Sequence, residues 1–369
     1  MKKFLCRLLL YVGPFLLFGA PFFAAGTMSG EIFDFDSLIA MQSESEEKLV
    51  GMAYNEQTAY YKLKNANVRK ADVLALGTSR VMQFREEYFG TSFYNCGGCV
   101  KGHYNEYINF MENMDEDALP KYLIVGLDAW NFNAETQRHE DIYDSYQQIV
   151  KSDKSKLSIV KRVGVDYFRG KWKISDLFHK YDNIGFNGII YGDGFRRDGS
   201  YFQREMITNP QNSEDYEYKD TFERIETGTA GYEHGGGVNA ETLQCLEMFL
   251  AFCEERDIRV ITFLPPYAPS VYDRMEETGE YGYIGEIEPA VKALCDKYDC
   301  EVYDFTDIRK LGCDDSYFID GFHGGEVAYA MMLREMCRED SRLSEVTDIE
   351  KLENRIDTRF SNKLFVEPE

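Results

Sequence analysis

The chain has 369 residues, of which 44% are hydrophobic and 15% aromatic. This composition provides enough apolar material for one large α/β domain with insertions or for two smaller domains, and it excludes a largely disordered chain. The net charge is −23 at pH 7. A surface that acidic repels nucleic acid and anionic lipid headgroups. No basic stripe stands out that would release counterions from phosphates, so nucleic-acid binding is excluded as a main role.

The beginning of the chain predicts a membrane anchor. Three basic residues precede an uncharged run from Leu8 to Gly26, which at 1.5 Å per residue nearly spans a hydrocarbon core of about 30 Å. Acidic residues follow the run, so the positive-inside rule places the N-terminus in the cytoplasm and the bulk of the chain outside the cell membrane. A cleaved signal peptide is the alternative, but the run exceeds the usual apolar region of about 7–15 residues. We predict an uncleaved, single-pass anchor.

The sequence divides into four parts. We assign residues 1–28 to the cytoplasmic start and transmembrane anchor, residues 29–70 to a juxtamembrane stalk, residues 71–340 to an α/β domain and residues 341–369 to a charged C-terminal tail. Within the domain, residues 130–235 are polar, aromatic and rich in glycine. We interpret them as a long insertion with its own local structure, because a structureless loop of that length is implausible in a compact domain.

Short apolar runs alternate with helical patterns in the rest of the domain. Strands are predicted over residues 71–77, 92–95, 121–128, 259–264 and 301–305, and helices over residues 80–88, 104–114, 239–257, 284–298 and 326–337. Continuous apolar runs are typical of strands that are buried on both faces of a parallel sheet. The pattern predicts a flavodoxin-like three-layer α/β sandwich with a mostly parallel five-stranded sheet, in which ligand sites lie beyond the carboxyl ends of the strands.

Three residues that could carry chemistry follow predicted strands. Ser79 comes two residues after Gly77 at the start of a helical stretch, where backbone N–H groups can hold an oxyanion. Asp320 and His323 lie in a glycine-rich turn before the last helix of the domain. The aspartate can orient the imidazole, which can then take the serine proton. The simpler interpretation is that Ser79 only caps a helix and that the other two residues only shape a turn.

Nine cysteines are present, and eight of them follow Cys6, an even number that allows disulfides in an oxidising compartment. Cys96 and Cys99 have CxxC spacing, but no second CxxC motif or pair of histidines accompanies them. We therefore predict no metal site and no cofactor.

Four short motifs resemble blocks I, II, III and V of the SGNH/GDSL hydrolase superfamily. They are Gly77-Thr78-Ser79-Arg80, Asn95-Cys96-Gly97-Gly98, Gly126-Leu127-Asp128 and Asp320-x-x-His323. The resemblance covers residues 70–135 and 240–338, and the insertion is unmatched. The N-terminal apolar segment and Leu264-Pro265-Pro266 look most similar to the extracytoplasmic, membrane-anchored branch, which includes the D-alanyl transfer protein of teichoic acids and the alginate O-acetylation proteins.

The resemblance implies catalytic roles for Ser79, Asp320 and His323. It implies oxyanion donors at the Ser79 amide, at Gly97 or Gly98, and at a block III asparagine. The sequence departs from the family pattern twice, with Thr78 in place of the block I acid and Asp128 in place of the block III asparagine. Asn95 and Asn131 are the candidates to replace the missing donor.

Four further residues are candidates for the lining of the substrate site. We expect Arg80 to brace the turn by pairing with an acid, or to contact an anionic substrate. Asp128 either lines the site or caps a strand end. Trp130 and Tyr267 lie on loops at the same predicted edge, where they stack on a sugar or belong to ordinary packing.

The resemblance implies transfer of an acyl group, such as acetyl or D-alanyl, onto a cell-surface glycan. Acyl donors such as coenzyme A are cytoplasmic, so by analogy a membrane-bound O-acyltransferase partner passes the acyl group outward. Two alternatives stay open. An esterase that removes acyl groups would use the same residues with water as the acceptor, and a catalytically inactive glycan-binding scaffold would use none of them.

Overall fold

The computed structural model describes residues 4, 13, 19–45, 47–135, 154–178, 181–339 and 341–368. The chain forms two compact units. The smaller unit joins residues 1–57 with residues 152–197 and 201–205, and the larger unit joins residues 58–151, 198–200 and 206–369. Most of the predicted anchor lies outside the described residues, and within the described part of the chain no helix is both long and apolar enough to cross a membrane.

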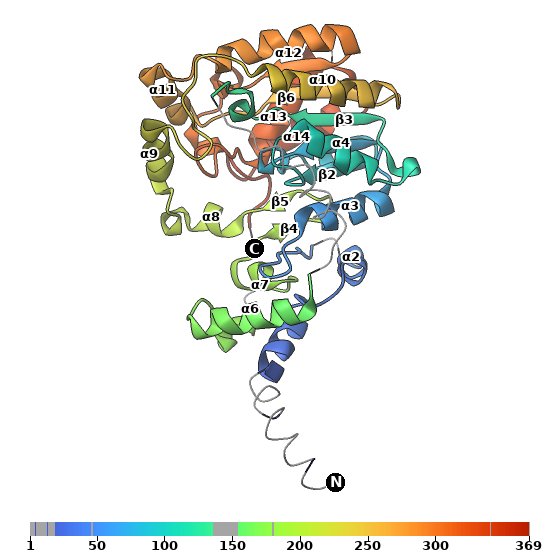
Figure 1. The fold of residues 1–369 in the computed structure, drawn as a ribbon, viewed down its shortest axis with the longest axis vertical. Coiled ribbons are helices and arrows are strands. Elements are labelled where there is room, and N and C mark those ends of the chain that lie inside the picture. Colours follow the sequence, from blue (N-terminus) through green and yellow to red (C-terminus); the bar gives the residue numbers. More distant parts are fainter. Residues whose placement is uncertain are drawn as a thin grey trace. The chain divides into compact units, whose positions relative to one another are not determined.

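A five-stranded sheet forms the centre of the larger unit (Figure 1). Its strands are β1 (Val73–Gly77), β2 (Phe93–Gly97), β3 (Tyr122–Gly126), β6 (Arg259–Leu264) and β7 (Glu301–Asp304). Their order is β2-β1-β3-β6-β7, and every neighbouring pair is parallel. The predicted five-stranded parallel sheet is confirmed. The strand order reverses next to β1, which is the place where ligands bind in open α/β sheets.

Helices cover the sheet. They include α3 (Thr58–Arg69), α4 (Tyr104–Glu112), α10 (Ala240–Glu254), α12 (Ile284–Tyr298), α13 (Glu326–Arg338) and α14 (Ile349–Asp357). The helix α10 packs against both α4 and α12, and Figure 1 shows α10 and α12 along the same side of the strands. Right-handed crossovers from β2 to β3, β3 to β6 and β6 to β7 place these three helices on one face. The arrangement is compatible with the predicted three-layer sandwich.

The predicted helix over residues 80–88 is instead two short 3₁₀ turns, η1 (Ser79–Val81) and η2 (Glu86–Tyr88). The cause is the side chain of Asn95 on β2, whose amide donates to the carbonyl oxygens of Val81 at 2.8 Å and Phe84 at 3.0 Å. An α-helix would need these carbonyls for its own hydrogen bonds. The tertiary contact therefore replaces the local one.

The smaller unit contains α2 (Phe35–Ser43), α6 (Lys156–Phe168), α7 (Phe186–Tyr191) and a hairpin of β4 (Gly194–Phe195) and β5 (Tyr201–Phe202). Its segments meet at Glu31, whose side chain is fully buried. The carboxylate accepts hydrogen bonds from the backbone N–H groups of Ala53, Tyr54, Asn55 and Phe186 at 2.8–3.0 Å. One carboxylate thus ties together three stretches of chain.

Cys295 and Cys300 form a disulfide between the end of α12 and the start of β7. Cys96 and Cys99 are buried and are not disulfide-bonded. In the part of the chain that the structure describes, no three His, Cys, Asp or Glu side chains gather in a way that could hold a metal ion.

Candidate active site

Ser79 lies two residues beyond the carboxyl end of β1, the strand between β2 and β3, and opens η1. The turn is held from both sides. The hydroxyl oxygen of Thr78 accepts a hydrogen bond from the Arg80 N–H at 3.3 Å, and Val81 packs over the strand ends. A Cβ atom on Gly126 would lie 2.5 Å from Val81 Cγ1, so only glycine at the end of β3 leaves room for this turn. The packing presents a half-buried Ser79 side chain at the sheet edge.

Asp320 and His323 lie in a tight turn before α13. The turn is closed by an antiparallel bridge between Phe318 and Gly324 and by a hydrogen bond of 2.8 Å from the Ile319 N–H to the His323 carbonyl oxygen. Asp320 Oδ1 accepts the backbone N–H of His323 at 2.8 Å. The backbone of the turn thereby holds the Asp320 carboxylate in place for its contact with the imidazole.

The three predicted catalytic side chains form one hydrogen-bonded triad. His323 Nε2 lies 2.8 Å from Ser79 Oγ, and His323 Nδ1 lies 2.7 Å from Asp320 Oδ2. With the carboxylate accepting the Nδ1 proton, Nε2 is left to accept the proton of the Ser79 hydroxyl. Residues 244 positions apart in the sequence are therefore placed for nucleophilic catalysis.

The Asp320 carboxylate is held in its charged form. Burial alone would raise its pKa, but the charge of His323 and the hydrogen bonds from His323 and from the Phe322 and His323 amides together lower the pKa below its ordinary value of 3.8. A charged carboxylate stabilises the imidazolium that forms when the serine is deprotonated. The His323 side chain keeps 14% of its surface exposed, so it stays in contact with solvent.

The structure gives other partners to most of the predicted oxyanion donors. The Gly97 N–H donates to Asn95 Oδ1 at 2.7 Å, and the Gly98 N–H donates to the carbonyl oxygens of Gly77 and Thr78, both at 2.9 Å. The Asn95 amide is used by the η1 region, as described above. These three residues support the serine turn rather than offering free donors.

Two oxyanion candidates remain. The side chain of Asn131 lies against Gly102, where a Cβ atom would meet its Nδ2 at 2.0 Å, and it is 7% exposed. Ser79 opens η1, so its backbone N–H has no acceptor within that turn. The Ser79 amide is the predicted donor best placed to face a developing negative charge on an acyl group held at Ser79.

Arg80 is buried beside the triad and does not line a surface, with 1% of the residue exposed. Its guanidinium donates to the carbonyl oxygen of Phe322 at 3.1 Å and to those of Pro265 and Pro266 at 2.9 and 2.5 Å. It connects the serine turn, the loop after β6 and the histidine turn. Of the two expected roles, the structure supports bracing and not contact with a substrate.

Asp128 is the acid that pairs with Arg80, at 3.7 Å between Oδ1 and the guanidinium. Its other oxygen accepts the Thr78 hydroxyl at 2.7 Å. Burial raises the pKa of Asp128, and Arg80 and Thr78 partly oppose that shift. Thr78 and Asp128, the two residues at which the sequence departs from the motifs that it resembles, thus contact each other. Asp128 is 1% exposed, so it is a buried partner and not part of a site lining.

The remaining candidates divide between packing and lining. Tyr267 is buried beside the Arg80 guanidinium, 4.5 Å from it to the ring centroid, which is the packing interpretation. Trp130 is half-buried and lies edge-on to Phe322 at 6.3 Å between ring centroids.

The sequence did not single out Phe322 as part of the site. Its ring packs 4.3 Å from the His323 imidazole, and its carbonyl oxygen accepts from Arg80. Its position between the two triad residues of the histidine turn was the available signal.

Comparison with known proteins adds no identification. No protein-family model matches the chain, and no curated protein is similar to it in sequence.

Proposed function

We propose that the protein is a serine-dependent acyl-transferring enzyme of SGNH type, with Ser79 as the nucleophile, His323 as the general acid–base and Asp320 as the residue that orients His323. The observation that carries the proposal is the pair of hydrogen bonds of 2.8 and 2.7 Å that joins the three side chains. Such a series of hydrogen bonds activates a hydroxyl that is otherwise a weak nucleophile.

The chemistry proceeds in two steps. Ser79 Oγ attacks the carbonyl carbon of an acyl ester or thioester while its proton passes to His323 Nε2. The tetrahedral oxyanion then collapses, and the leaving alcohol or thiol takes the proton from His323. In the second step His323 accepts the proton of an acceptor hydroxyl, which attacks the acyl-enzyme, and Ser79 leaves with that proton.

We propose a cell-surface glycan as the acceptor, with acetyl or D-alanyl as the acyl group and a membrane-bound O-acyltransferase as the donor partner. The support is the uncharged run from Leu8 to Gly26, which would hold the protein at the outer face of the cell membrane next to such a donor. The proposed location is extracytoplasmic.

An esterase with water as the acceptor is the second candidate. The exposure of His323, at 14% of its side chain, favours it, because a water molecule that reaches the imidazole competes with a glycan hydroxyl for the acyl-enzyme.

Labelling with a fluorophosphonate probe tests the nucleophile. We expect the full-length protein to be labelled and Ser79→Ala to remain unlabelled. Ser270→Ala is the matched control, because Ser270 also lies at the start of a helix and bonds a carboxylate, that of Asp315, but it is not part of the triad. Absence of labelling in the unsubstituted protein would favour the inactive scaffold over both enzymes.

The acetyl content of surface polymers separates the two enzymes. Cells that carry Ser79→Ala should lose polymer acetylation if the protein is a transferase and gain it if the protein is an esterase. Cells that carry Ser270→Ala provide the reference.

A further inference from the structure

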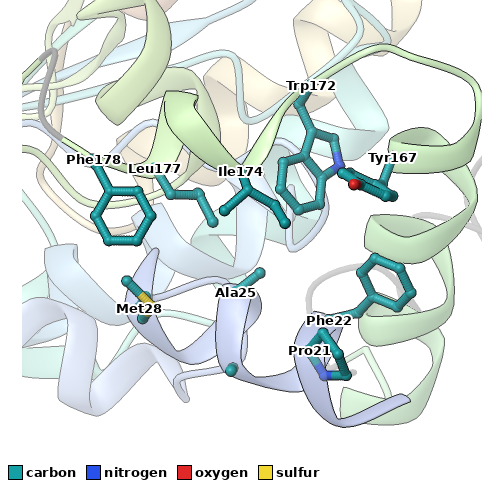
Figure 2. A pocket seen from close by; sticks show the side chains of 10 residues that line it. Pro21, Phe22, Ala25, Met28, Tyr167, Trp172, Ile174, Leu177 and Phe178 are labelled. Carbon is teal, nitrogen blue, oxygen red and sulfur yellow. The ribbon is translucent and has the colours of Figure 1, made fainter. Parts of the chain in front are cut away.

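An apolar pocket of about 360 Å³ opens in the smaller unit. Figure 2 shows Ile174, Leu177 and Trp172 along one side of it, with Ala25 and Met28 opposite. The single polar atom of the Trp172 side chain is already used, because Nε1 donates to the Val163 carbonyl oxygen at 3.0 Å. The pocket therefore offers hydrocarbon surface and suits an apolar occupant.

One wall of the pocket is a helical segment over residues 19–28, which continues the uncharged run of the sequence. This segment packs on α6 through Phe22. The Phe22 ring lies 5.6 Å from the rings of Tyr167 and Phe168, and a Cβ atom on Gly164 would lie 2.9 Å from it. The glycine allows Phe22 to approach α6 closely, so the apolar segment packs directly against this helix.

Large apolar side chains around this contact face solvent. Phe168 is 70% exposed, Leu157 is 78% exposed, and Ile174 and Phe178 at the pocket rim are 54% and 55% exposed. Leu157 and Phe168 fall on one stripe of α6, since eleven residues make about three turns, and Lys161 lies between them on the same stripe. We call Phe22, Met28, Phe168, Ile174 and Phe178 the apolar collar. Exposed apolar patches of this kind mark interaction sites.

The stretch that carries Phe168, Ile174 and Phe178 of the collar has a charge opposite to that of the whole chain. Residues 154–178 hold seven basic and two acidic residues, a net charge of +5 in a protein of net charge −23. Lys156, Lys161, Arg162, Lys171 and Lys173 in this stretch are exposed. The expectation that the protein repels anionic lipid headgroups therefore does not hold for this segment, because a total charge conceals a local one.

Aromatic and aliphatic side chains beside clustered lysines are the composition that binds the interface of anionic membranes. We propose that the apolar collar docks on an anionic phospholipid bilayer, with lipid acyl chains in the pocket and headgroup phosphates against the basic residues of the 154–178 stretch. The contact adjoins the uncharged run, since Phe22 belongs both to that run and to the apolar collar. It does not depend on the chemistry at Ser79.

Quenching of tryptophan fluorescence tests the proposal on the full-length protein in phosphatidylcholine vesicles with brominated acyl chains, with and without phosphatidylglycerol. Phe168→Trp places a reporter on the collar. Met248→Trp is the control, because Met248 is 54% exposed on α10 of the larger unit, next to Glu247. The signal is the emission added over that of the unsubstituted protein.

We expect the Phe168→Trp emission to be largely lost in vesicles that contain phosphatidylglycerol, and the Met248→Trp emission to be retained. Adding Lys161→Glu, Lys171→Glu and Lys173→Glu should restore most of the emission. The proposal is overturned if Phe168→Trp is quenched no more than Met248→Trp, or equally with and without phosphatidylglycerol. It is also overturned if the reporter is shielded from brominated lipid and from aqueous acrylamide alike, because a second copy of the chain or another protein segment would then cover the collar.

Discussion

Ser79 and Arg80 are neighbours in the sequence, yet they belong to two different polar groups. The group around Ser79 reaches solvent, and its members pair at hydrogen-bond distances of 2.7 and 2.8 Å. The group around Arg80 is buried, and one guanidinium nitrogen and the Asp128 Oδ1 that it faces have no hydrogen-bond partner among the described residues. The first is arranged for proton transfer and the second for holding segments together.

The difference shows how the turn that carries Ser79 can be held rigidly without burying the side chains of Ser79 and His323. Arg80 donates to backbone carbonyl oxygens on both loops that flank the turn, so the charged brace lies beside the triad and leaves Ser79 and His323 accessible. A buried charge of this kind is costly to strand without its partner. Substitutions in the group around Ser79 should therefore lower mainly the activity, and substitutions in the group around Arg80 should lower mainly the stability.

The largest expected effect is on catalysis. His323→Ala should lower the rate of ester hydrolysis by on the order of 10⁴–10⁶-fold, because the serine loses its base. Asp320 keeps the hydrogen bonds from the backbone amides of residues 322 and 323 in this variant, so the unfolding midpoint should fall less than when Arg80 is replaced. Hydrolysis of a p-nitrophenyl ester measures the rate. His234→Ala is the matched control, because His234 lies outside the triad, with its Nε2 2.8 Å from the Ile225 carbonyl oxygen. Equal rates for the two variants would contradict the role of His323 as the base for Ser79.

The next effect is on stability. Arg80→Met should lower the free energy of unfolding by about 3–5 kcal/mol, because Asp128 is left as an unpaired buried charge. The double variant Arg80→Met/Asp128→Leu should lose less than the single one, since no charge remains to be stranded. Urea unfolding measures both. Additive losses in the double variant would contradict a buried ion pair.

A smaller loss is expected from Thr78→Val, which keeps the side-chain shape but removes the hydroxyl that donates to Asp128. The cost should be about 1–3 kcal/mol, the usual penalty for an unsatisfied buried acceptor. Thr227→Val on the exposed surface of α9 (Lys219–Thr227) should change the free energy of unfolding by no more than about 0.5 kcal/mol. Urea unfolding of both variants checks this, and a matching loss in the two would count against the Thr78 contact.

The smallest expected effect is a change in the free energy of unfolding at acid pH. The pKa of Asp320 is lowered in the folded protein from 3.8, so its contribution to stability is present above that pH and is lost as the pH falls through the folded value. The difference in stability between the unsubstituted protein and Asp320→Asn should narrow below about pH 4. For Asp128 the pKa is raised, so the sign is reversed and its ionisation costs stability as the pH rises above 3.8. Urea unfolding over a pH series measures the difference between the unsubstituted protein and Asp320→Asn. A difference that stays constant with pH would contradict the contact between Asp320 and His323.

The sheet and the position of Ser79 could be predicted because both depend on local pattern, and Asp320 and His323 because they stand in a short motif before a helix. Apolar runs that end in Gly77 and Gly126 mark buried parallel strands, and residues just beyond such strands meet at one edge. The partners of the glycine amides and of Arg80 could not be predicted. They depend on hydrogen bonds between residues far apart in sequence, such as Thr78 with Asp128 and Arg80 with Phe322, for which the sequence carries no periodic signal.

The hydrogen bonds that the Glu31 carboxylate accepts limit where the polypeptide can be shortened. Glu31 is the first charged residue after Arg7, and four backbone amides depend on its carboxylate. A truncation that removed the apolar beginning together with Glu31 would leave those amides buried without an acceptor. Soluble versions of this protein should therefore begin before residue 31, or they will lose the fold of the smaller unit together with the segment that they were meant to discard.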